Sequence, residues 1–223
     1  MITQLWKFSF VAALILLSAA PSWAAVVINE IDPNQASAVD AQEFIELFGT
    51  PLASLNGHVV VLFNGATDTS YQAYDLDGYV LGPTGFFLLG VTGMSPAPDI
   101  TFVNNTVQNG ADAVALYLAN GSDFPNGTPP TTTNLLDAIV YDNGNPIDTG
   151  LLTGLGQATQ YNENAVGTAD VVSIGRTPNG TGGFDLQTPT PMNSGIPQAP
   201  EPTSWLLGAQ LCWSAALMRR RRS

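Results

Sequence analysis

The sequence is poor in cysteine and in positive charge, and both deficits restrict what the protein can be. Its one cysteine, Cys212, lies in an apolar run near the C-terminus, so residues 25–199 can form neither a disulfide nor a thiolate site. The same stretch holds one basic side chain, Arg176, and seventeen acidic ones, a formal charge of −16. Such a segment repels phosphate backbones, which argues against nucleic acid as a partner.

The residue types that carry catalysis in many hydrolases are also scarce. His58 is the only histidine, and no Gly-x-Ser-x-Gly elbow is present to supply a nucleophile beside it. One histidine cannot complete a zinc site, and no lysine follows Lys7, which excludes Schiff-base chemistry in the domain. No phosphate loop or dinucleotide fingerprint occurs. We therefore predict that the protein is not an enzyme and needs no cofactor.

Carboxylates are the remaining resource for chemistry. Glu30 and Glu46 lie on expected strands that can be neighbours, where they could form a glycosidase-like pair. A structural role is the favoured interpretation: Arg176, the only base among seventeen acids, is expected to form an ion pair with Glu30 or Glu46.

Calcium is a weaker hypothesis for other acids of the domain. Two turn-rich segments resemble fragments of calcium loops, but neither has the closing glutamate of an EF-hand. Asx turns in hairpins explain these segments with fewer assumptions. The candidate ligands would be Asp75, Asp77, Asp142 and Asp148.

The first 24 residues have the pattern of a secretory signal peptide. Lys7 supplies the positive charge, and residues 8–20 form the apolar region. Ser22 and Ala24 are small residues at positions −3 and −1, which predicts export through the Sec translocon and cleavage between Ala24 and Ala25. A permanent anchor is the alternative, but the apolar run is shorter than the roughly 20 residues that a bilayer span needs.

The C-terminus has three consecutive parts. Pro200, Glu201 and Pro202 are followed by a short hydrophobic run at 205–218, which we predict to be a helix, and then by Arg219, Arg220, Arg221 and Arg222. This order resembles the PEP-CTERM sorting signal, which implies an exosortase-type transpeptidase as partner and removal of the tail. The arginines should stay cytoplasmic, which leaves the domain on the far side of the inner membrane. A plain tail anchor is the alternative.

The two ends together predict three parts of the chain. Residues 1–24 are the signal peptide, residues 25–195 are the domain, and residues 196–223 are a linker and the sorting tail. The expected course is a precursor tethered transiently to the inner membrane, then a place in the cell envelope, at the outer surface or in the extracellular matrix. The PEP-CTERM resemblance implies a Gram-negative bacterium that makes extracellular polysaccharide.

The domain between the ends is expected to be all β. Short runs rich in β-branched and aromatic residues alternate with Asn-Gly and Asp-Gly dipeptides, which favour tight turns between strands. Longer loops are expected at 121–134 and 142–168, and the number of strands favours a β-sandwich. The expected strands are 26–31, 43–48, 58–63, 71–76, 86–91, 113–118, 136–141 and 171–174.

Short motifs along the domain resemble the lamin-tail family. They are Ile-Asn-Glu-Ile at 28–31 with Glu-Phe-Ile-Glu-Leu at 43–47, Leu-Asn-Gly at 55–57, Asp-Ala-Val-Ala-Leu at 112–116, Asp-Ala-Ile-Val-Tyr at 137–141, Ser-Ile-Gly-Arg at 173–176 and Thr-Pro-Met-Asn at 190–193. The resemblance implies an immunoglobulin-like β-sandwich. Met192, where the family usually has glycine, and the long loop at 142–168 depart from its pattern.

The sequence favours an exported, non-catalytic protein that interacts with or adheres to polysaccharide or surface proteins. One alternative is an accessory module that acts in trans with a secreted hydrolase or nuclease, because lamin-tail domains occur joined to such enzymes. The other is a carbohydrate-binding domain. In that case Tyr71, Tyr74 and Tyr79 would be the candidate aromatic contacts.

Overall fold

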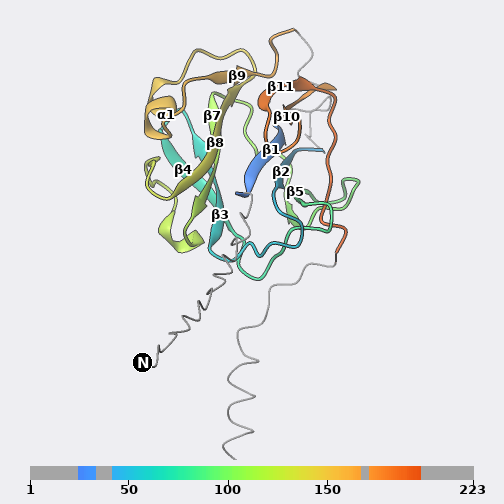
Figure 1. Ribbon diagram of the computed structural model, residues 1–223. Helices are drawn as coiled ribbons and strands as arrows, with labels where there is room; N and C mark the ends of the chain where they lie inside the picture. The colour runs from blue at the N-terminus through green and yellow to red at the C-terminus, as the bar shows by residue number, and fades with distance from the viewer. Residues whose placement is uncertain (1–24, 34–41, 167–170, 197–223) are drawn as a thin grey trace, which may run out of the picture.

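The computed structural model describes residues 25–33, 42–166 and 171–196. These residues form two β-sheets that pack face to face, as the two layers in Figure 1 show. Helical elements within them are short and include an α-helix, α1 (Thr149–Gly154), and a 3-10 turn, η1 (Gly121–Asp123). The prediction of an all-β sandwich is therefore confirmed for this part of the chain.

The predictions for the two ends fall largely outside the described ranges, which start at Ala25 and stop at Ile196. The signal peptide at 1–24 and the sorting segments at 200–222 are among the residues left out. No helix in the described ranges is long and apolar enough to span a bilayer.

The first sheet has six strands, and only one neighbouring pair in it is parallel. In spatial order the strands are β11 (Gly183–Gln187), β10 (Ser173–Thr177), β1 (Val27–Asp32), β2 (Phe44–Phe48), β5 (Phe86–Val91) and β6 (Ile100–Phe102). The β5–β6 pair is parallel, and the other neighbours are antiparallel. This sheet therefore places β10, from the C-terminal part of the domain, beside β1, its first strand.

The second sheet has five strands and again one parallel pair. Its order is β4 (Thr69–Asp75), β3 (His58–Asn64), β7 (Asp112–Leu118), β8 (Leu135–Asp142) and β9 (Gln160–Asn162). The parallel pair is β8–β9 at one edge. Edge strands β9 and β11 thus lie on the same open side of the sandwich, where Tyr161 of β9 contacts Phe184 of β11.

The core lies between the sheets and continues over the outer face of the second sheet. Alternate residues of a strand point to opposite faces, so Val60 and Leu62 of β3 enter the core between the sheets while Val59 and Val61 point outward. The outward set is covered by Phe124, after η1, and by Leu151 and Leu155, in and after α1. Burial on both faces explains the continuous apolar runs of this sheet.

All eight predicted strands are present, within a few residues of the expected bounds. Strands β6, β9 and β11 were not predicted, because the first two have three residues each and β11 is largely polar. Helix α1 lies in the segment predicted as a loop at 142–168. Its N-terminus is capped by Asp148, whose side chain accepts a hydrogen bond from the Leu151 N–H at 2.9 Å.

The last described residues cross the outer face of the first sheet, and we call residues 188–196 the terminal strap. Three alternate backbone N–H groups in it are bound by acids of the sheet or its loops. Thr190 donates to Glu30 at 2.9 Å, Met192 to Glu46 at 2.6 Å and Ser194 to Asp99 at 2.8 Å. The strap is the chain descending along the right of Figure 1. The strap covers Glu30 and Glu46, which the sequence analysis considered as partners of Arg176 or as a glycosidase-like pair.

Both ends of the described domain lie at the same end of the sandwich. Gly49 packs against Val26 and Leu81, and a Cβ atom at the neighbouring Gly82 would lie 2.0 Å from the Ser194 carbonyl oxygen. Residue 82 must therefore be glycine for the strap to pass this closely. Helix α1 lies at the opposite end, as Figure 1 shows.

Candidate functional site

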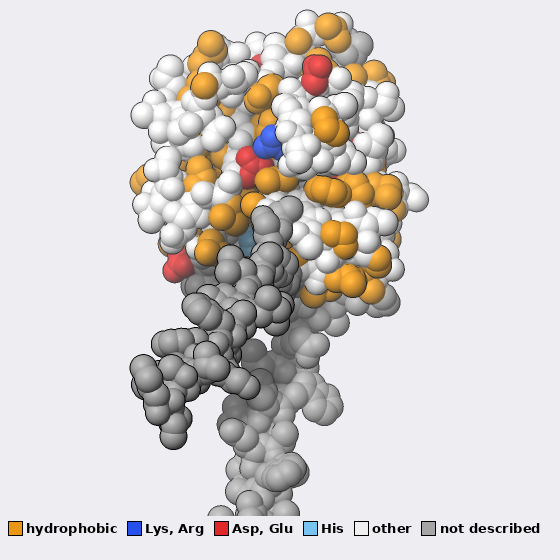
Figure 2. Space-filling model, in the orientation of Figure 1, with side chains coloured by type: hydrophobic (Ala, Val, Ile, Leu, Met, Phe, Trp, Pro, Cys, Tyr) orange, Lys and Arg blue, Asp and Glu red, His pale blue; other side chains and the backbone are white. Residues whose placement is uncertain are grey.

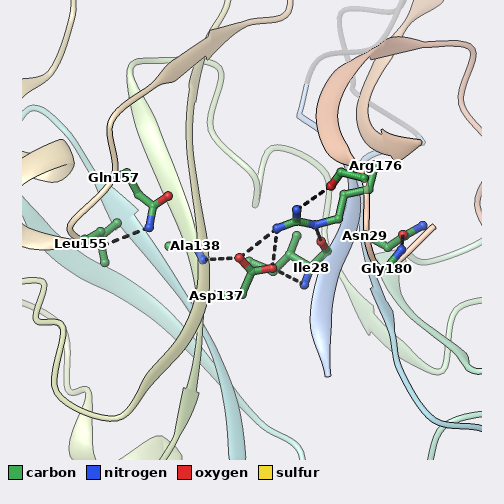
Figure 3. A network of polar contacts seen from close by, with 9 residues as sticks. Ile28, Asn29, Asp137, Ala138, Leu155, Gln157, Arg176 and Gly180 are labelled. Atoms are coloured by element: carbon green, nitrogen blue, oxygen red, sulfur yellow. Dashed lines mark hydrogen bonds and ion pairs between the residues drawn. The ribbon is translucent and has the colours of Figure 1, made fainter. Parts of the chain in front are cut away.

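The only described basic side chain ties the two sheets together. Arg176 of β10, in the first sheet, pairs with Asp137 of β8, in the second. Its Nη2 donates to both carboxylate oxygens of Asp137, at 2.9 and 3.0 Å, and the two side chains are 17% and 13% exposed. Figure 3 shows the pair bridging the gap between the layers, and Figure 2 shows a basic and an acidic side chain together at the surface there.

Further contacts hold both members of the pair in place. Arg176 donates from Nε to the Ile28 carbonyl at 2.8 Å and from Nη1 to the Gly182 carbonyl at 2.9 Å. Its guanidinium carbon lies 4.0 Å from the centre of the Phe184 ring. Asp137 also accepts the N–H groups of Ile28 and Ala138. Burial raises the pKa of Asp137, and Arg176 and these donors counteract that rise.

The predicted ion pair of Arg176 with Glu30 or Glu46 is wrong. Gly175 is the residue of β10 that lies opposite Glu30, so the next side chain, Arg176, points to the other face of the sheet. That face looks toward the second sheet, where Asp137 is the acid within reach. A difference of one residue in register therefore decided which carboxylate forms the ion pair with Arg176.

A hollow of about 240 Å³ lies beside the Arg176–Asp137 pair on the open side of the sandwich. We call it the seam pocket, because its walls come from both sheets. Gln157, Thr159 and Tyr161 approach from the segment around β9, and Phe184 comes from β11. The Tyr161 and Phe184 rings meet edge to face, with centroids 5.5 Å apart. Gln157 donates to the Leu155 carbonyl at 3.1 Å, as Figure 3 shows.

Glu30 and Glu46 are cross-strand partners, as the pairing of β1 with β2 required, but they are fully buried. Glu30 accepts hydrogen bonds from Ser173 Oγ and from the N–H and Oγ of Thr190. Glu46 accepts from Asn29 Nδ2 and the Met192 N–H, both at 2.6 Å. The glycosidase-like hypothesis for this pair therefore fails, because the strap and its hydrogen bonds occupy the place of a substrate.

Burial raises the pKa of Glu46 to about 8. The Asn29 and Met192 donors lower it, and the nearby charge of Glu30 raises it further. Two carboxylates on one buried face, with no cation beside them, resist carrying two charges at once. The pair binds the strap, and ionisation of Glu46 opposes folding.

The four calcium candidates are not brought together. Asp75 accepts the N–H groups of Asp77 and Gly121, and Asp77 accepts the Gly57 N–H. At the opposite end of the sheet, Asp142 accepts the N–H groups of two turn residues and Asp148 caps α1. In the described ranges no group of three or more His, Cys, Asp or Glu side chains is arranged to hold a metal ion. Asp75 and Asp142 make the Asx-turn contacts of the simpler interpretation, whereas Asp77 binds a loop N–H and Asp148 caps a helix.

A larger hollow of about 540 Å³ lies at the end of the sandwich opposite the termini, and we call it the acidic pocket. Asp68, Asp112 and Asp148 are among its lining residues. Burial raises the pKa of Asp68, and the adjacent Asp148 raises it further. Burial also raises the pKa of Asp112, against two backbone donors. The sequence analysis named Asp112 only as part of a family motif and did not name Asp68; the two are 44 residues apart and line one hollow only in the fold.

The predicted aromatic contacts do not form an exposed platform. Tyr71, Tyr74 and Tyr79 are half-buried and pack against the core between the sheets. The aromatic residues at a hollow are instead Tyr161 and Phe184, in segments where no strand was predicted. Comparisons with protein-family models, with curated proteins and with solved structures found no match. We therefore base the functional proposal on the geometry of the domain and on the two ends of the sequence.

Proposed function

We propose that the protein is a non-catalytic component of the cell envelope or extracellular matrix, displayed outside the inner membrane to interact with polysaccharide or surface proteins. The observation that carries this proposal is the position of both described ends at one end of the sandwich. Segments that enter the membrane on either side of the domain would leave from that end. The acidic pocket, at the other end, would then face away from the membrane.

The terminal strap supports this arrangement mechanically. Glu30, Glu46 and Asp99 bind three alternate backbone N–H groups immediately before the linker. A hydrogen bond typically contributes about 0.5–1.5 kcal/mol, and about 1.5–3 kcal/mol where the acceptor is charged. The linker therefore starts from a fixed point, and a pull on the tail is borne by the sheet rather than by the loop after β11.

The charge distribution favours a neutral or basic partner over an anionic one. Seven described acids are buried, so the surface is less acidic than the formal charge of −16 suggested. They are Glu30, Asp32, Glu43, Glu46, Asp112, Asp142 and Glu163. Glu43, for example, accepts three successive backbone N–H groups, from residues 105–107. Because the surface is less acidic than the formal charge suggested, neutral polysaccharide is a suitable partner as well as basic surface proteins.

The resemblances supply the rest of the proposal. The lamin-tail motifs support an immunoglobulin-like class for the sandwich. The tail at 200–222 supports sorting by an exosortase-type transpeptidase, which would remove it after export through the Sec translocon in a Gram-negative host.

Intact mass and cell fractionation in the native host test this proposal. We expect a mature chain that begins at Ala25, lacks residues 205–223 and fractionates with the envelope or the medium. Replacing Pro200, Glu201 and Pro202 by alanine should retain the tail and leave the protein with the inner membrane. An unprocessed wild-type chain in the cytosol would contradict the proposal.

A further inference from the structure

We propose that the seam pocket binds one neutral sugar ring of a polysaccharide chain, an inference that rests on the polysaccharide interaction proposed above. The pocket has a rigid polar floor, an aromatic wall and a rim with unused hydrogen-bonding groups. It is smaller than the roughly 300–1,000 Å³ of pockets for drug-sized ligands, which fits a single ring.

The floor is preorganised because its two charged groups are held from several sides. Asp137 accepts hydrogen bonds from two backbone N–H groups and from Arg176, which also binds two backbone carbonyls. The pair has no net charge, so a neutral ligand meets no uncompensated ion at the floor. An anionic ligand would meet an acidic domain whose only described cation is already neutralised.

The rim offers the groups that sugar hydroxyls need. Among the described residues, the side-chain oxygen of Gln157 and the hydroxyls of Thr159 and Tyr161 have no hydrogen-bond partner. A side-chain amide oxygen accepts, and the two hydroxyls both donate and accept, so together they match the mixed character of sugar hydroxyl groups. Thr159 is exposed, which leaves the pocket open to a long chain as well as to a free sugar.

The wall supplies apolar contact. Tyr161 and Phe184 are half-buried, so part of each ring remains exposed beside the hollow. The edge-to-face contact between them and the guanidinium over Phe184 fix both rings. A fixed ring binds the C–H face of a sugar with little loss of side-chain entropy.

The decisive experiment is calorimetric titration of the exported, processed protein with three probes. Cellohexaose and maltohexaose are the neutral probes, and hexagalacturonate is the anionic one. The test variant is Gln157→Ala with Thr159→Val, which removes two rim groups. Tyr161→Phe removes one hydroxyl and keeps the ring. Gln72→Ala is the matched control, because Gln72 is also half-buried but lies on β4, at the opposite edge of the same sheet.

We expect the wild type to bind a neutral probe more tightly than hexagalacturonate. The double variant should raise the Kd about tenfold or more, Tyr161→Phe should raise it severalfold, and Gln72→Ala should leave it unchanged. Binding of no neutral probe, or preference for the anion, would overturn the inference. Neutral binding that the rim variants do not weaken would also overturn it. In that last case the proposed polysaccharide interaction would stand, and its site would lie elsewhere on the protein. Cell fractionation tests independently whether the protein is displayed outside the inner membrane.

Discussion

The seam between the sheets and the outer face under the terminal strap bury acids in two different ways. In the seam, Asp137 has a full cation beside it and is bound by Arg176 through two contacts. Under the strap, Glu30 and Glu46 lie opposite each other with only neutral donors. The comparison shows that backbone N–H groups, hydroxyls and a side-chain amide can replace a cation as partners of a buried acid. Burial raises the pKa of the acid in both regions, to about 8 for Glu46.

Removing the cation from the seam should have the largest effect. Arg176→Ala leaves Asp137 buried without its partner, and breaking such a pair typically costs about 3–5 kcal/mol. We expect a loss of about 3 kcal/mol in the free energy of unfolding, measured by urea denaturation at pH 7. The double variant Arg176→Ala with Asp137→Asn should recover part of it. Equal stability of Arg176→Ala and wild type would show that the pair contributes little to folding.

Removing an acid from the strap face should cost less, because only neutral donors lose a partner. Asp99→Ala removes the carboxylate that accepts hydrogen bonds from the N–H groups of Leu88 and Ser194 and from the Ser194 hydroxyl. We expect a loss of about 2 kcal/mol and faster hydrogen exchange at the Ser194 amide. Asp185→Ala, at an exposed position of β11, is the control and should change neither quantity. Unchanged exchange at Ser194 would show that the strap is held by other contacts.

Glu46, under the strap, should make the stability of the protein depend on pH. The pKa of Glu46 is about 8 in the folded protein, above its ordinary 4.5, so the folded state holds a proton that the unfolded state releases. Stability should therefore fall as pH rises from about 4.5 to about 8, by more than about 1 kcal/mol. Glu46→Gln removes this titration. Urea denaturation at several pH values between 5 and 9 measures the free energy of unfolding. This free energy should fall less steeply with pH in the variant than in the wild type, and equal slopes would contradict the raised pKa of Glu46.

An acid at the edge of the acidic pocket should matter least. Asp148→Ala removes the N-cap of α1, and losing such a cap costs about 1 kcal/mol. Asp148→Asn keeps an accepting oxygen and should retain most of the stability. Thermal unfolding of the two variants measures the difference, and a loss as large as that of Asp99→Ala would show that this helix cap contributes as much as a strap contact.

The strand pattern was predictable because it depends on local properties. Apolar runs such as 58–63 and 113–118 are bounded by turn dipeptides, and the structure has strands there. Strands β6 and β9 were missed because three residues carry too little pattern, and they form only by pairing with a neighbour. The buried Glu30–Glu46 pairing was partly predictable for the same reason, since consecutive strands are usually neighbours.

The sites were much less predictable. The partner of Arg176 depended on which face of β10 its side chain occupies, and that follows from pairing with β1, which is far away in the sequence. The pocket residues Gln157 and Thr159 lie in a segment predicted as a loop, where polar residues give no indication of what they face. Tyr71, Tyr74 and Tyr79 were candidates by composition alone, and packing against the core removed them.

By itself, the sequence determined the β-rich class, the turn positions and the shortage of cations, because these follow from local backbone preferences and from composition. Only the tertiary structure decided that Asp137 receives the one guanidinium and that Glu30, Glu46 and Asp99 bind the strap. The physical reason is that a carboxylate accepts from whichever donor the fold brings within about 3 Å, and that donor comes from residues far along the chain.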